Sequence, residues 1–276
     1  QQFRDMHVEG TLSEAHRFPG FLPWHRAYLL DLERELQNIE PRVSLPYWRF
    51  DQPAPRLFSK DFIGLEDANG TVEFSSGHPL EKWTTDGVPG INRHALFDKQ
   101  TSQASGELGI VLSESATLDI GKPDRLYRLF RTMEGQPHGA AHLSFSSISS
   151  ISEAKEAARD PLFFLLHANV DRLWALWQFL FERFDINSSD TYTTAGAVPR
   201  IGHNLQDTMW PWNQITGDGT SSNPRPQNAP GGNFPASTIV TAPGLTPRVR
   251  DMIDYQGVFA AASWLGFGYD DVPYSQ

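Results

Sequence analysis

Apolar residues recur at three- and four-residue steps in one early segment of the chain. They are Leu29, Leu32, Leu36 and Ile39. This spacing places them on one face of an α-helix. We therefore predict an amphipathic helix over residues 28–39, with His25 at its head, after an apolar turn that contains proline.

A second segment, "DPLFFLLHANVDRLWALWQFLFERF", is apolar nearly all round, which is typical of a central, buried helix. Asp160 can cap this helix, and Pro161 suits its first position because no amide hydrogen is needed there. His167 lies within the segment, where a buried imidazole without a partner is costly. We therefore expect His167 to have a specific partner.

Two shorter helices are predicted between these segments, one over residues 124–134 and one that carries "PHGAAHL". From 188 to 247 the chain is rich in Pro, Gly, Asn, Ser and Thr, and "PRPQNAPGGNFP" is its loosest part. This composition favours a long loop region that closes a domain. Because the chain has no internal repeat, we expect residues 1–276 to form one mainly α-helical domain with little β-structure.

Composition and charge exclude several classes of protein. The 276 residues carry a net charge of −10 with no basic stripe, which argues against a nucleic-acid binder. No apolar run approaches the ~20 residues that span a membrane, and the N-terminal residues do not resemble a signal peptide. Asn69 and Asn187 begin the glycosylation triplets "NGT" and "NSS", which fit an extracellular protein. The oligomeric state stays open.

Cysteine is absent from the chain. Its absence excludes disulfides, cysteine nucleophiles and thiolate metal sites, so a bound metal would need nitrogen or oxygen ligands. The "GxSxG" elbow of serine hydrolases is also missing.

Six of the nine histidines fall into two groups. The first group is His7, His16 and His25, at nine-residue intervals, and the second is His138, His142 and His167. The four-residue step within "HGAAH" places two rings on one helix face. We expect both groups to bind metal, although these residues alone leave zinc, copper and iron open. The remaining histidines are expected to be ordinary surface or capped residues: His78, His94 and His203.

Several longer strings resemble one known family. "FLPWHRAYLLDLERELQ" followed by "LPYWRFD" is similar to the first copper-binding region of the tyrosinase and catechol oxidase family, the type 3 copper proteins. "DPLFFLLHANVDRLWALWQ" resembles the second region, and "MEGQPHGAAH" resembles the helix before it. "MWPWN" and "GFGYDD" are similar to late elements of the catalytic domain. Within this family, short secreted fungal catechol oxidases look most similar.

The resemblance implies a four-helix bundle that encloses two copper ions, with helices starting near His25, Asp124, Pro137 and Asp160. It assigns copper A to His7, His16 and His25, and copper B to His138, His142 and His167. It also implies that Glu134 holds an ordered water near the coppers. Asp171, one helical turn after His167, is expected to help orient the ligand rings.

The activity implied is the oxidation of catechols to ortho-quinones, with O2 as co-substrate and small phenols as the binding partners. Relatives that hydroxylate monophenols well often have asparagine directly after the first histidine of the second site. This chain has Gly139 there, so weak monophenol hydroxylation is expected, with Leu143 also steering the ring. The alternatives are a tyrosinase, an ortho-aminophenol oxidase and a dicopper oxygen carrier. A dizinc or di-iron hydrolase is disfavoured because neither group includes a carboxylate.

Some features depart from the family pattern. Many relatives have a second histidine where this chain has Leu166, and some link a cysteine to the second histidine of the first site, which this chain cannot do. Only six residues precede His7, so the N-terminus is expected to be trimmed. No shielding C-terminal domain is expected, which favours a mature enzyme with an accessible site, and an oxidase over a carrier. The resemblance to secreted relatives also implies a secreted protein.

Overall fold

The computed structural model describes residues 2–8, 12–85, 87–194, 202–216 and 234–274. Its α-helices are α1 (Gln2–Met6), α2 (Leu12–Ala15), α3 (Phe21–Ile39), α4 (Glu114–Leu118), α5 (Tyr127–Phe130), α6 (Ala140–His142) and α7 (Leu162–Leu180). Its 3-10 helices are η2 (Arg131–Glu134), η4 (Ser150–Ser152), η5 (Ala157–Arg159), η6 (Val249–Met252) and η7 (Ala261–Ser263). The segment η3 (Gly135–Gly139) contains a kink at Gln136, whose backbone angles are extended and not helical. The expected mainly α-helical fold is therefore confirmed.

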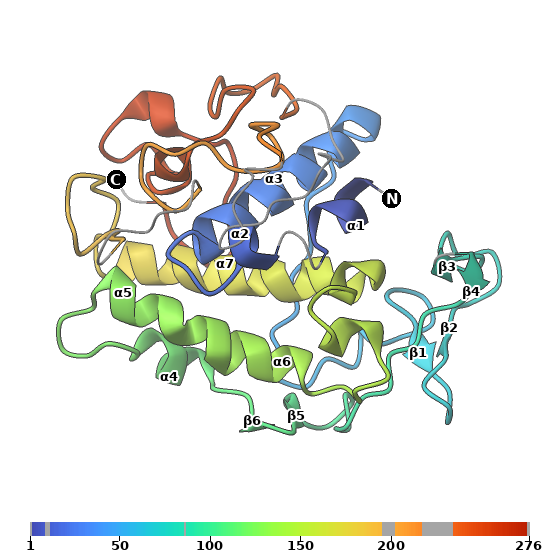
Figure 1. The fold of residues 1–276 in the computed structure, drawn as a ribbon. Coiled ribbons are helices and arrows are strands. Elements are labelled where there is room, and N and C mark those ends of the chain that lie inside the picture. The colour runs from blue at the N-terminus through green and yellow to red at the C-terminus, as the bar shows by residue number, and fades with distance from the viewer. Residues whose placement is uncertain (1, 9–11, 86, 195–201, 217–233, 275–276) are drawn as a thin grey trace.

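The two long helices α3 and α7 pack against each other at the centre of the molecule (Figure 1). Most residues of α7 are buried, as the all-round apolar pattern predicts. Large aromatic side chains fill the core around both helices, among them Trp24, Trp174 and Trp177, each less than 2% exposed. This packing gives the molecule a rigid pair of helices from which to present side chains.

Helix α3 begins earlier than its apolar spacing predicts. Its first residue is Phe21, so Pro23 lies in the first turn, where a missing amide hydrogen breaks no helical hydrogen bond. His25 is consequently in the second turn, and its placement at the head of the helix is wrong. The apolar turn between His16 and the helix is shorter than expected for the same reason.

The two shorter predicted helices join end to end. Helix α5 runs into η2, η3 and α6, and together they form a column beneath α7 with a kink at Gln136, drawn in green in Figure 1. The column begins at Tyr127 and not at Asp124 because Arg125 has a φ of 52°, a left-handed conformation that an α-helix cannot contain. Its far end carries the "HGAAH" histidines.

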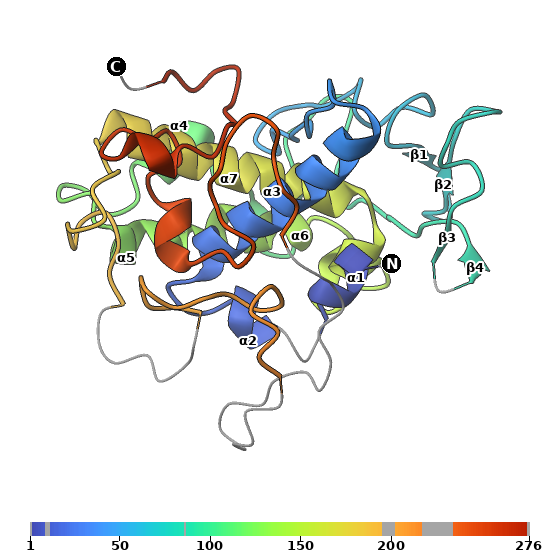
Figure 2. The ribbon, with the colours of Figure 1, turned by 90° about the horizontal axis from the view of Figure 1, so that it is seen from above.

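Strands are few among the described residues. Three antiparallel pairs of two-residue strands are present: β1 (Leu65–Glu66) with β2 (Val72–Glu73), β3 (Thr84–Thr85) with β4 (Val88–Pro89), and β5 (Ser105–Gly106) with β6 (Gly109–Ile110). The first two pairs project from one end of the molecule in both ribbon views (Figures 1 and 2). They lie away from the central helices.

The predicted loop region over 188–247 contains no helix or strand in its described parts. A β-bridge between Thr208 and Arg248, together with backbone hydrogen bonds from Val249 to Asp207 and from Arg250 to Leu205, ties it to the C-terminal segment. Residues 224–233, most of "PRPQNAPGGNFP", lie outside the described residues. Among the helices that the structure describes, none combines the length and the apolar character needed to cross a bilayer.

Candidate metal centre

The two histidine groups converge in the core of the molecule. Within each group the ring nitrogens that could bind an ion lie within 4.8 Å of one another. The groups are the ones that the sequence predicts: His7, His16 and His25, and His138, His142 and His167. Six side chains from five separate segments thus meet in two triads.

Some of these rings lie on long helices and others on short segments of the chain. His7 follows α1 directly and His16 follows α2, whereas His25 is held within α3. In the second triad, η3 and α6 carry two of the rings at the four-residue step, and α7 carries the third. The rigid helix pair therefore supplies one ligand to each triad.

The Nε2 atoms of each triad face one another. In the first triad, the Nε2 atoms of His7 and His16 are 2.9 Å apart, and His25 Nε2 is buried without a hydrogen-bond partner. In the second, His167 Nε2 lies 3.3 Å from the Nε2 atoms of both His138 and His142. Ring nitrogens that converge in this way can share hydrogen bonds or bind a cation between them.

Backbone carbonyls fix the orientation of three rings through the opposite nitrogen. His25 Nδ1 donates to the Phe21 carbonyl at 2.9 Å, and His138 Nδ1 donates to the Glu134 carbonyl at 2.7 Å. His142 Nδ1 donates to the Ile151 carbonyl at 2.6 Å. Because a carbonyl oxygen can only accept, Nδ1 must carry the hydrogen in each ring, and Nε2 keeps its lone pair for a metal.

Burial keeps the rings neutral. Desolvation by burial lowers the pKa values of His7, His25, His138 and His167 well below the usual histidine range, and neighbouring imidazoles lower them further. Burial also lowers the pKa of His142 to about 4. Neutral imidazole is the protonation state that binds metal ions, so these five rings are ready for coordination at neutral pH.

The two triads form one centre. The rings of His25 and His167, which belong to different triads, stack with centroids 4.1 Å apart and planes 9° from parallel. Phe163 packs against His167 at 4.3 Å and Phe21 packs against His138 at 4.9 Å. Aromatic side chains therefore enclose the paired sites and help to keep water out.

This donor set fits two copper ions. Each triad offers three imidazole nitrogens and no carboxylate or thiolate, and imidazole suits copper in proteins. The unpartnered Nε2 of His25 and the facing lone pairs of the second triad are then explained by the ions they would hold. The two triads are the dicopper site that the sequence predicts.

Glu134 and Gly139 both lie beside this centre. The Glu134 carboxylate accepts hydrogen bonds from His16 Nδ1 at 3.1 Å and from the Arg17 amide at 2.7 Å. Gly139 has helical backbone angles, and a Cβ added there would lie 3.2 Å from the Glu134 carbonyl oxygen. Leu143 directly follows the last residue of the short helix α6.

The hydrogen bonds of Asp171 go to other side chains and not to a ligand ring, so its role in orienting the rings stays a prediction. Its carboxylate accepts from Arg26 Nε at 2.7 Å and from the Tyr269 hydroxyl at 2.6 Å. Arg26 is fully buried, so its charge requires a buried counter-charge. Sequence reasoning missed Arg26, although its place directly after His25 in an apolar segment could have indicated it.

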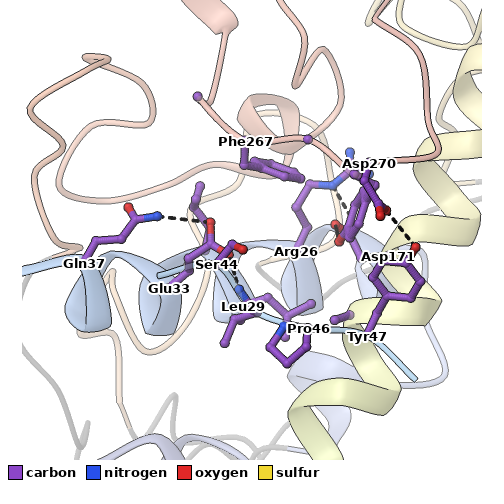
Figure 3. Close-up of a pocket in the computed structure, with 16 residues that line it drawn as sticks. Arg26, Leu29, Glu33, Gln37, Ser44, Pro46, Tyr47, Asp171, Phe267 and Asp270 are labelled. Atoms are coloured by element: carbon purple, nitrogen blue, oxygen red, sulfur yellow. Dashed lines mark hydrogen bonds and ion pairs between the residues drawn. The ribbon is translucent and has the colours of Figure 1, made fainter. Parts of the chain in front are cut away.

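The Arg26–Asp171 pair borders a cavity of about 610 Å³ between α3, α7 and the C-terminal segment. Figure 3 shows Leu29 and Glu33 from α3, Tyr47 from the segment after α3, and Phe267 from the C-terminal segment around it. No copper-ligand histidine lines this cavity. It is therefore separate from the dicopper centre.

The other three histidines stay outside the triads, as expected. His78 is half-buried and capped, because its Nδ1 accepts from the Leu80 amide at 3.1 Å. His203, however, is fully buried and not at the surface. Its Nδ1 accepts from the Gly20 amide at 3.2 Å and its ring packs on Phe18 at 5.0 Å, so a satisfied hydrogen bond makes burial tolerable.

Comparison with known proteins agrees with this centre. Residues 1–180 match the family described as the common central domain of tyrosinase. Tyrosinase from Streptomyces antibioticus is 32% identical over 218 residues, which cover 73% of this chain and 75% of that protein. Grixazone synthase from Streptomyces griseus is 31% identical over 209 residues, which cover 59% of this chain and 66% of that protein.

Among solved structures, tyrosinase from Burkholderia thailandensis has a similar fold, with a TM-score of 0.51 at 14% identity over 92% of this chain. The chain spans 62% of that protein, and less than two thirds of the solved polyphenol oxidases it resembles. The family match covers both histidine triads. The chain belongs to the tyrosinase family of type 3 copper proteins.

Proposed function

We propose that this type 3 copper protein is a phenol oxidase that acts preferentially on catechols. The observation that carries the proposal is the single enclosed centre of six imidazoles, without cysteine or carboxylate ligands. When bound, the two coppers would supply electron transfer between the diphenol and O2. Two catechols and one O2 would give two ortho-quinones and two waters, which balances both atoms and electrons.

The most exposed ligands indicate where a phenol would approach. The His16 side chain is 13% exposed and His142 is 9% exposed, whereas His25 and His167 are almost completely buried. Beside His16, Glu134 reaches the surface with 18% of its side chain exposed. We infer that the substrate ring enters between these two ligands, with the aromatic core behind them.

The preference for diphenols rests on the side chains at this entrance. Gly139 offers no side chain that could polarise a water near the coppers, and one Glu134 oxygen already accepts two hydrogen bonds. Deprotonation of a monophenol is therefore poorly supported. A catechol, which can bring two oxygens to two coppers, depends less on such help.

Three alternatives remain distinct from this proposal. A tyrosinase would hydroxylate monophenols efficiently, an ortho-aminophenol oxidase would prefer an amine at the second position, and an oxygen carrier would bind O2 without turnover. The partial exposure of His16 and His142 favours an enzyme over a carrier.

The decisive experiment is turnover by the copper-loaded protein on catechol, phenol, tyrosine and ortho-aminophenol, with O2 uptake and product absorbance followed together. We expect catechol to react fastest and the monophenols slowly. Comparable rates on phenol and catechol would support a tyrosinase. Reversible O2 uptake without product would support a carrier.

We also propose that the protein is secreted and glycosylated. Asn69 and Asn187, the two acceptor positions, are both exposed, so a glycosyltransferase could reach them. Treatment of protein secreted by a eukaryotic host with an N-glycosidase should lower its mass. Asn69→Gln together with Asn187→Gln should remove that mass shift.

A further inference from the structure

His16 is a copper ligand that no helix contains. It lies between the one-turn helix α2 and helix α3, and the next residue, Arg17, has a φ of 67°. That left-handed conformation is unfavourable for a residue with a side chain. The chain contains no cysteine, so no covalent sulfur link can hold the ring. Some other group must fix this ligand.

The side chain that meets this need is Glu134, 118 residues further along the chain. A single carboxylate oxygen, Oε1, accepts both from His16 Nδ1 at 3.1 Å and from the Arg17 amide at 2.7 Å. The first bond fixes the ring and leaves Nε2 facing the other ligands of its triad. The second bond satisfies the backbone of the left-handed residue.

The same residue also supports the other triad. The backbone carbonyl of Glu134 accepts from His138 Nδ1 at 2.7 Å. Its side chain therefore holds a ligand of copper A, while its main chain holds a ligand of copper B. Because only the side chain changes on substitution, the two contacts can be separated by experiment.

We propose that Glu134 is a positioning residue that holds His16 in place for copper A, acting as a hydrogen-bond acceptor. This role rests on the dicopper centre and not on the proposed preference for catechols. It differs from holding a water for phenol deprotonation, because it acts on copper binding before any substrate is present. The charge of the carboxylate is not required for it.

The first test compares Glu134→Ala with Glu134→Gln. Glutamine keeps an oxygen that can accept from both donors, whereas alanine removes it. We expect Glu134→Ala to weaken binding of one of the two coppers about tenfold to a hundredfold, the range for loss of a residue that orients a metal ligand. Glu134→Gln should restore most of that affinity. Competition against a copper(I) chelator such as bicinchoninate measures both, without substrate.

A second test shows which of the two copper sites is weakened by Glu134→Ala. His142→Ala leaves the first triad complete, and His16→Ala leaves the second complete. Adding Glu134→Ala should weaken the remaining copper in the His142→Ala background and leave it unchanged in the His16→Ala background. Equal weakening in both backgrounds would mean a general structural effect and would overturn the proposal.

Folding is checked by the melting temperature of each copper-free variant. Glu153→Ala, at an exposed glutamate near the Ile151 carbonyl, is the matched control and should bind two coppers normally. If Glu134→Ala does not fold, Glu134→Leu repeats the test, because it keeps the aliphatic bulk and removes only the oxygens. Unchanged copper affinity without the acceptor would refute the role, as would a loss in Glu134→Gln as large as in Glu134→Ala.

Discussion

At the scale of single residues, Gly139 is the position where one side chain should alter the reaction. Its backbone is helical, so any residue can adopt its conformation, and an added Cβ meets only the Glu134 carbonyl oxygen, at 3.2 Å. Asparagine there could polarise a water at the entrance. We predict that Gly139→Asn raises the ratio of monophenol to diphenol turnover on the order of tenfold, below the range of a full acid–base catalyst.

The matched control for this variant is Gly135→Asn. A Cβ at Gly135 meets nothing within 4 Å, so the same side chain would be placed in open space four residues earlier. Its substrate ratio should equal that of the unchanged protein. An unchanged ratio in Gly139→Asn as well would show that position 139 does not set the preference.

Asp31 should make stability depend on pH. It is 3% exposed and accepts from Trp212 Nε1 at 2.6 Å. Burial raises its pKa to about 6 from the ordinary 3.8; Glu35 also raises it, while the Trp212 bond and Arg34 oppose the change. Between these pH values the native state binds more protons than the unfolded chain, so the free energy of unfolding falls as pH rises.

Asp31→Asn keeps an oxygen for Trp212 and removes this titration. Urea unfolding of the copper-free proteins at about pH 4.5 and pH 7 should show the variant losing about 2 kcal/mol less than the unchanged chain over that interval. Other titrating groups are common to both proteins and cancel in the comparison. An identical fall in the free energy of unfolding for both proteins would mean that Asp31 is ionised in the native state over this whole pH interval.

Sequence reasoning reached the metal ligands and missed the contacts around them, for a physical reason. The four-residue spacing of His138 and His142 indicates a shared helix face. The other four ligand histidines are assigned through the resemblance to a known family. The contact of Glu134 with His16 and that of Asp171 with Arg26 join residues 118 and 145 positions apart. No local period encodes such pairs, which arise only when helices pack.

At the scale of elements, the start of α7 is fixed by a buried ion pair. Arg93 and Asp160 are both fully buried and joined by two bonds, of 2.7 and 2.6 Å. Asp160 also accepts from the Leu162 amide, the first of α7, at 2.9 Å, although Pro161 and not Asp160 is the residue directly before the helix. The sequence could not identify Arg93, because it lies in an irregular segment far from the helix.

We predict that Arg93→Ala lowers the free energy of unfolding by about 3–5 kcal/mol, since it leaves a buried carboxylate uncompensated. Lys60→Ala breaks a pair with Glu73 in which both side chains are about half exposed, and should cost less than about 1 kcal/mol. Urea denaturation of both variants provides the measurement. Equal losses would show that the buried pair does not anchor α7.

Element boundaries were the least predictable part of the fold. The apolar period locates α3, and the all-round apolar character of its segment locates α7, because α3 buries one face and α7 is buried over most of its surface. The apolar period does not locate the start of α3, which depends on Pro23 being tolerated in a first turn. The start of α5 depends on the left-handed angle at Arg125. Such backbone details have little signature in the sequence.

At the scale of the whole molecule, copper should stabilise the fold. Its ligands come from residues 7 to 167, so the two ions would join most of the described N-terminal segments to α7. A ligand that binds only the native state adds about 2.7 kcal/mol at a hundredfold excess over its Kd. We predict a higher melting temperature with copper and its reversal by a chelator.

His142→Ala tests this stabilisation. The variant should retain about one copper, lose turnover and show a smaller rise in melting temperature, because one triad is incomplete. His78→Ala, outside both triads, should behave like the unchanged protein. Two coppers with full activity in His142→Ala would exclude the second triad as a copper site.

The stacked rings of His25 and His167 have a consequence for how the protein fills with metal. Each ring serves a different ion, and their 4.1 Å contact means that fixing one plane also fixes the other. Binding of the first ion therefore includes the loss of conformational entropy on ordering both rings, and binding of the second ion does not include that loss again. We expect cooperative filling, so that native mass spectrometry at limiting copper shows mostly empty and doubly filled molecules. A dominant singly filled species would mean independent sites. With cooperative filling, activity would rise in direct proportion to the amount of copper added when copper is limiting, because the ions enter in pairs and each pair completes one enzyme. With independent sites, activity would rise with the square of that amount.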